Sequence, residues 1–82
     1  MKLSYSQHFL RSYEEAPPIV QRAFDKQAGL LIRDPHHPSL HAKKYHEAQG
    51  VWQARINRDW RFYFTIEGDT YCLHEMKSHP KK

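Results

Sequence analysis

The stretch from Val51 to Phe64 limits the possible folds of this chain most strongly, because it has the pattern of a β-hairpin. Apolar residues alternate with polar and basic ones on both sides of a turn at Asn57, Arg58 and Asp59. Successive side chains of a strand point to opposite faces of a sheet. We therefore expect an apolar, core-facing set and a largely polar set: Trp52, Ala54, Ile56, Phe62, Phe64 and Ile66 against Gln53, Arg55, Arg61, Tyr63 and Thr65.

Two arginines of this hairpin are expected to face each other. If Ile56 pairs with Trp60, the same register sets Arg55 opposite Arg61. Like charges directly across a sheet are destabilising, so a chain that places them there is expected to hold an anion between them. The alternatives are that one arginine turns into solvent, or that the register differs by two residues.

Size and composition predict one small domain over residues 1–82. A chain of 82 residues with 39% hydrophobic content buries roughly 60 to 65% of the surface of its unfolded form. Its one cysteine, Cys72, cannot form an internal disulfide, and no signal peptide or apolar run of about 18 residues is present. We expect a cytoplasmic protein without membrane contact. Its net charge of +4 favours a polyanion or an acidic protein as partner.

The first half of the chain has the pattern of a strand and two helices. A short strand is expected from Lys2 to Ser6, followed by a helix that Ser6 caps. Pro17 and Pro18 end this helix and can begin the next, which runs towards Arg33. The buried stripes are Phe9 and Tyr13 in the first helix, and Val20, Phe24, Ala28 and Leu31 in the second.

The second half has the pattern of strands joined by turns. The segment from Asp34 to Leu40 is expected to be a loop, and 42–45 a brief strand. The hairpin follows, and a tight turn at 67–69 leads to a strand from Thr70 to about Lys77. The predicted class is α+β: an N-terminal strand and a two-helix hairpin packed on a twisted, mainly antiparallel sheet of about four strands.

Histidines and glycines give little support for metal or nucleotide chemistry. His37, His41 and His46 lie near one another in sequence, but no cysteine pair accompanies them and the segment contains two turns. With only three glycines, the chain also lacks a phosphate-binding loop. We expect neither a metal nor a cofactor.

Basic residues concentrate in the sheet half and alternate with tyrosines. Arginine binds phosphate through a bidentate fork, and exposed aromatic rings stack on unpaired bases, so the set predicts RNA binding. The alternative is a solvated sheet face with lysines that protect edge strands, and with the tyrosines in the core. The basic residues are Lys43, Lys44, Arg55, Arg58, Arg61, Lys77 and His79, and the tyrosines are Tyr45, Tyr63 and Tyr71.

Short motifs along nearly the whole chain resemble the RelE/ParE superfamily of bacterial toxins. The resemblance comes from the order and spacing of the motifs, since each is weak alone. They are Phe9 to Tyr13, Pro17 to Gln21, Leu30 to Leu40, Lys43 with Lys44, Val51 to Arg55, Trp60 to Phe62, Gly68 to Thr70, and His79.

The resemblance implies a type II toxin that a cognate antitoxin neutralises. RelE-like members cleave mRNA on the ribosome without metal, so mRNA and ribosomal RNA are expected partners. Arg61 stands where such enzymes hold the scissile phosphate, Arg55 where the family has a basic residue, and His79 where several branches carry a catalytic histidine or arginine. Without the resemblance, His79 is simply a tail residue. RNA gripping is expected of Lys43, Lys44, Arg58 and Lys77.

Two departures from the family pattern leave the proton-transfer groups open. Gln53 stands where some members have a lysine, and the C-terminal tyrosine of several active members is absent. Because ParE-like members poison DNA gyrase, a non-enzymatic gyrase poison or an inactive interaction module is the alternative function. Candidates for a second acid or base are Glu75, Glu47, His37 and His41.

Overall fold

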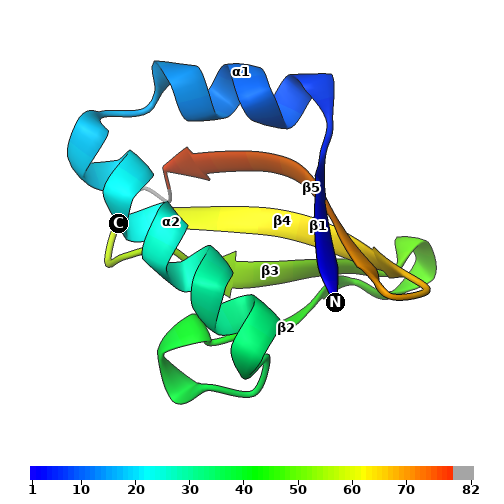
Figure 1. The fold of residues 1–82 in the computed structure, drawn as a ribbon. Coiled ribbons are helices and arrows are strands. Elements are labelled where there is room, and N and C mark those ends of the chain that lie inside the picture. The colour runs from blue at the N-terminus through cyan, green and yellow to red at the C-terminus, as the bar shows by residue number, and fades with distance from the viewer. Residues whose placement is uncertain (79–82) are drawn as a thin grey trace.

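The computed structural model describes residues 1–78, which form a five-stranded sheet with two helices packed against it (Figure 1). The strand order is β1-β5-β4-β3-β2. The α+β class is confirmed, with one strand more than the four expected. The elements are β1 (Lys2–Tyr5), α1 (Gln7–Glu15), α2 (Pro18–Arg33), η1 (Pro38–Leu40), β2 (Lys43–His46), η2 (Glu47–Gln49), β3 (Val51–Arg55), β4 (Trp60–Glu67) and β5 (Thr70–Ser78).

The sheet is antiparallel except where β1 joins it. β2, β3, β4 and β5 pair antiparallel with their neighbours, as short connections require. β1 pairs parallel to β5, because the two helices carry the chain between β1 and the rest of the sheet. Gly68, at φ 61°, makes the tight turn between β4 and β5, a backbone conformation that glycine adopts without strain.

The two helices begin and end close to the predicted residues. Ser6 caps α1, since its Oγ accepts a hydrogen bond from the Phe9 amide at 2.9 Å. Pro18 is the first residue of α2, where the missing amide hydrogen has no intrahelical role. Figure 1 shows α2 turning back from α1 and running obliquely across one face of the sheet.

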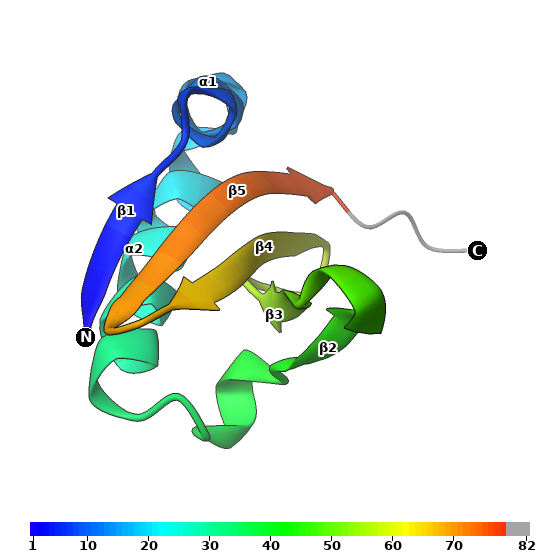
Figure 2. The ribbon, with the colours of Figure 1, turned by 90° about the vertical axis from the view of Figure 1, so that its right-hand side faces the viewer.

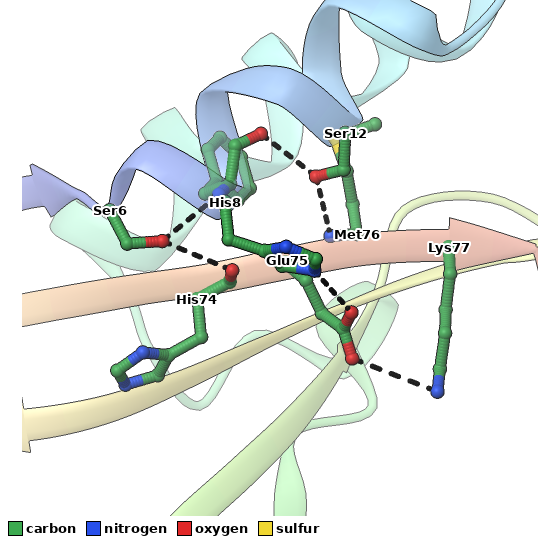
Figure 3. A network of polar contacts seen from close by, with 8 residues as sticks. Ser6, His8, Ser12, His74, Glu75, Met76 and Lys77 are labelled. Carbon is green, nitrogen blue, oxygen red and sulfur yellow. Dashed lines mark hydrogen bonds and ion pairs between the residues drawn. The ribbon is translucent and has the colours of Figure 1, made fainter.

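α1 takes the place of β1 as the neighbour of β5 where β1 ends (Figure 2). The Ser6 amide donates to the Leu73 carbonyl at 3.1 Å. Ser6 Oγ donates to the His74 carbonyl at 3.1 Å, and the Met76 amide donates to Ser12 Oγ at 3.2 Å (Figure 3). An unpaired strand edge leaves polar groups that need partners. These hydroxyl contacts therefore hold α1 against β5.

The core lies between the helices and the sheet and is rich in aromatic rings. Phe24 of α2 packs edge to face on Phe62 of β4, with ring centroids 5.2 Å apart. The apolar set predicted for the hairpin is confirmed for Ala54, Ile56, Phe62 and Phe64. Ile66 is an exception, with 45% of its surface exposed. It lies near the end of β4, where it lines an open pocket together with Leu31 of α2.

The segment between α2 and β2 contains more structure than expected. Residues 38–40 form the 3-10 turn η1, and His37 Nδ1 accepts a hydrogen bond from the Ser39 amide at 3.1 Å. The side chain of Leu40 is fully buried in the core. The loop prediction is confirmed for residues 34–37 and was wrong for residues 38–40, where the buried Leu40 anchors the 3-10 turn. Among the described helices, no segment has the length and hydropathy needed to span a membrane.

Candidate nucleic-acid site

Three basic residues form a row across adjacent strands on the sheet face that α2 does not cover. Arg55 of β3 is opposite Arg61 of β4, as the hairpin pattern predicted, and Arg61 is opposite Lys77 of β5. Directly opposite residues have Cβ atoms about 5 Å apart. Arg55, Arg61 and Lys77, here called the cationic row, therefore concentrate three positive charges at one end of the sheet.

The two arginines of the cationic row share one hydrogen-bond acceptor. Arg61 Nη1 donates to the Asn57 carbonyl at 2.8 Å and to the Trp60 carbonyl at 3.0 Å. Arg55 Nε donates to the same Asn57 carbonyl at 3.3 Å. The predicted register is thus confirmed, and the turn carbonyls supply part of the negative potential that was expected from a bound anion.

The turn that provides this carbonyl is fixed by the Asn57 side chain. Asn57 Oδ1 accepts hydrogen bonds from the amides of Asp59 at 2.9 Å and Trp60 at 3.0 Å. Asparagine commonly folds turns in this way, by bonding to backbone groups two or three residues on. Both guanidinium groups are positioned by the resulting turn.

Polar residues form a second row next to the cationic row. In register across four strands lie Lys43, Gln53, Tyr63 and Glu75. Tyr63 and Gln53 are buried, and the Tyr63 hydroxyl donates to Gln53 Oε1 at 3.2 Å. Burial raises the pKa of Tyr63, and the nearby Tyr45 and Glu75 raise it further while Arg61 lowers it. Tyr63 therefore stays a neutral hydrogen-bond donor.

Three of the other predicted residues fall at different distances from the cationic row. His41 Nε2 lies 3.4 Å from Arg55 Nη1, next to the row. Glu75 is adjacent to it and lies 3.7 Å from Lys77 Nζ. His37 instead points to Ser39 and belongs to the local structure of η1.

The predicted RNA-gripping residues do not all share one face. Lys43 faces the same side as Gln53, whereas Lys44 lies over the Trp52 ring, 5.4 Å from its centroid, on the opposite face. Arg58 is exposed in the hairpin turn and Glu47 is exposed in η2. His79 lies outside the described residues; Ser78, to which it is bonded, pairs with Trp60.

His8 belongs to this region and was missed by sequence analysis. Its Nε2 lies 3.0 Å from Glu75 Oε1, across the boundary between α1 and β5 (Figure 3). The two residues are 67 positions apart, so no local pattern indicates the contact. Within residues 1–78, no three histidine, cysteine or acidic side chains are grouped as metal ligands would be.

No protein-family model and no curated protein sequence matches this chain. Solved structures do match it over almost its full length. A YoeB/ParE toxin from Agrobacterium tumefaciens superposes with a TM-score of 0.80, at 17% identity, over 98% of this chain and 100% of that one. The chain has the fold of RelE/ParE superfamily toxins.

Two further solved structures with this fold are protein complexes, and the second of them is a toxin-antitoxin complex. The archaeal RelE-RelB complex from Pyrococcus horikoshii gives a TM-score of 0.79 at 13% identity, covering 99% of this chain and 97% of that one. The RelBE2 complex from Mycobacterium tuberculosis gives 0.76 at 22% identity, covering 96% of each chain. At these identities the similarity establishes the fold.

Proposed function

We propose that this protein is a type II toxin that cleaves mRNA on the ribosome, inhibits translation and is neutralised by a cognate antitoxin. The observation that carries the proposal is the cationic row, which joins two guanidinium groups and an ammonium group across β3, β4 and β5. The toxins that share the fold support the class of protein.

The cationic row has the chemistry needed to bind a phosphodiester. Metal-free RNA cleavage deprotonates the 2′-hydroxyl, forms a bond from that oxygen to the adjacent phosphorus and releases the 5′-oxygen with a proton. Negative charge gathers on the phosphate oxygens, where positioned cations stabilise it. Arg61 would hold the scissile phosphate, and Arg55 and Lys77 would flank it.

The proton transfers require groups beside the row. We assign the acid that protonates the 5′-oxygen to His79, because the family resemblance puts a catalytic histidine or arginine at this position, which lies outside the described residues. Glu75 and His41 are the remaining acid and base candidates, since both lie next to members of the cationic row. Lys43 and Arg58 would bind the flanking phosphates.

The antitoxin would cover apolar and basic surfaces together. A pocket of about 470 Å³ opens between the end of α2, η1 and β3, and Trp52, Phe64 and Tyr71 contribute to its lining. Ile66, which is 45% exposed, also lines this pocket. A partner segment with apolar and acidic side chains would match this surface and the net charge of +4.

The direct test measures mRNA cleavage in a translating extract. Purified protein is added, and the 5′ ends of cleaved reporter mRNA are mapped by primer extension. We expect discrete cuts that require translation and that the Arg61→Ala variant loses by at least about a hundredfold, as for removal of a charge-stabilising donor.

Arg22→Ala is the matched control, because Arg22 is an exposed arginine of α2 outside the cationic row. It should cut as the wild type does. Intact mRNA with wild-type protein, together with inhibition of DNA gyrase in a supercoiling assay, would overturn the proposal in favour of the gyrase poison. Cleavage by Arg61→Ala at the wild-type rate would remove Arg61 from the catalytic assignment.

A further inference from the structure

Two β-bulges, one in β2 and one in β5, bring side chains to one groove. In β2 the register shifts between Lys44 and His46, which leaves Tyr45 as the extra residue. In β5 the register shifts where Tyr63 pairs with Glu75 but Phe64 pairs with Leu73, which leaves His74 as the extra residue. Bulges commonly re-aim side chains next to functional sites.

Both bulge residues line the same groove, which has a volume of about 510 Å³. Tyr63 and Val51 contribute to its base, and Ser6 and His8 come from the start of α1; Glu75 and the two bulge residues complete the lining. The groove adjoins the cationic row, since Tyr63 and Glu75 each stand two residues from Arg61 and Lys77 on their strands. Two residues of a strand span about 7 Å.

Tyr45 offers an aromatic surface in this groove. It is 56% exposed, and its ring packs edge to face on the buried Tyr63 ring with centroids 4.9 Å apart. Tyr63 is fixed by its hydrogen bond to Gln53. Tyr45 is therefore held on a rigid support while much of its surface stays open to a stacking partner, as in single-strand binding proteins.

Glu75 offers a hydrogen-bond acceptor to the same groove. Its Oε1 lies 3.0 Å from His8 Nε2 and its Oε2 lies 3.7 Å from Lys77 Nζ (Figure 3). The side chain remains 33% exposed. An ionised carboxylate has about four acceptor sites on its two oxygens, so it can accept from a ligand while these two neighbours hold it in place.

We propose that this groove binds one unpaired guanine base of RNA, next to the phosphate at the cationic row, with Tyr45 stacking on the base and Glu75 accepting from its edge. The inference rests on the proposed function and adds a base subsite to it. Guanine fits because its N1 and N2 groups present two adjacent donors to one carboxylate. Inosine keeps the N1 donor but lacks the N2 donor, and adenine has neither of them.

The test uses short single-stranded DNA oligonucleotides, which lack the 2′-hydroxyl and so report binding without cleavage. Thymidine heptamers that contain one central guanine, inosine or adenine are labelled, and binding to the full-length protein is measured by fluorescence anisotropy. We expect the guanine oligonucleotide to bind about tenfold more tightly than the other two, in line with a good bidentate contact.

Variants separate stacking from edge recognition. Tyr45→Ala should weaken binding of all three oligonucleotides by roughly tenfold, and Tyr45→Phe should restore it. Glu75→Gln should remove the preference for guanine, because the amide presents one acceptor and one donor. Glu67→Gln, an equal change of charge at an exposed position at the other end of β4, should keep the preference. Thermal unfolding of each variant checks that the fold is retained.

The outcomes distinguish this subsite from the proposed nuclease. Equal affinity of the wild type for all three oligonucleotides would overturn the subsite, as would a guanine preference that survives Glu75→Gln. If mRNA cleavage occurs without a guanine preference, the nuclease stands and the subsite is wrong. If the guanine preference is observed and cleavage is not, the groove is a base-binding site in a protein that is not a nuclease.

Discussion

Arg55 and Arg61 donate hydrogen bonds to the same oxygen, the carbonyl of Asn57, at 3.3 and 2.8 Å. This shared acceptor explains how two like charges stay opposite each other in the hairpin. It also holds both guanidinium groups at one end of the sheet before any ligand binds. Preorganised donors of this kind stabilise developing charge without reorganising during the reaction.

The hairpin turn should therefore control both stability and activity. Asn57→Ala removes the acceptor of two amide hydrogen bonds, and we expect a loss of about 1 to 3 kcal/mol in the free energy of unfolding. mRNA cleavage should fall with it, because the backbone carbonyl of residue 57, which both arginines share as acceptor, is no longer held in place by the turn. Urea unfolding and the cleavage assay measure the two effects. Asn57→Asp keeps the acceptor oxygen, and a turn equally weakened in that variant would contradict this explanation.

Leu40 should contribute to stability like a core residue despite its place in the loop region. Its side chain is fully buried, and Leu→Ala changes at such sites lower the free energy of unfolding by about 2 to 5 kcal/mol. Chemical denaturation of Leu40→Ala should show this loss. The exposed neighbour Ser39 is the control position, and a Leu40→Ala effect as small as that of Ser39→Ala would show that η1 is not anchored.

Lys77 and Lys44 should differ in their effect on nucleic-acid binding. Lys77 belongs to the cationic row, whereas Lys44 lies over Trp52 on the other face. For single strands, each phosphate contact makes the slope of log affinity against log salt concentration steeper by about 0.7. Lys77→Gln should lower the slope by about this amount and Lys44→Gln should not, in anisotropy measurements from low to high salt. Equal slopes for both variants would remove Lys77 from the phosphate site.

Alkaline pH should destabilise the fold through its buried tyrosines. Burial raises the pKa of Tyr71 in the folded protein, whereas the unfolded chain ionises near 10. The folded state then binds more protons than the unfolded state near this pH. The contribution of neutral Tyr71 to the free energy of unfolding is therefore fully present below about pH 10, and it is lost as the pH rises through the pKa of the folded protein. Urea unfolding of the wild type and Tyr71→Phe at rising pH tests this. The wild type should lose stability more steeply, and parallel curves would contradict the assignment.

The fold could be predicted from local patterns, but several site contacts could not. Alternation in the hairpin gave the Arg55 and Arg61 pairing, and Ser6 and Pro18 marked the helix starts, because these signals lie within a few residues. The contact between His8 and Glu75 depends on how α1 lies along β5. The bulges at Tyr45 and His74 depend on the register of neighbouring strands, and neither leaves a signal in the residues themselves.

The central claim is that the cationic row acts on mRNA, and pulse labelling of cells after induction tests it most directly. Incorporation of labelled amino acids, thymidine and uridine is followed with wild-type protein, Arg61→Ala and Arg22→Ala. We predict that protein synthesis stops first with the wild type and Arg22→Ala, and continues with Arg61→Ala. Arrest of DNA synthesis first, with translation continuing and a DNA-damage response, would contradict the account.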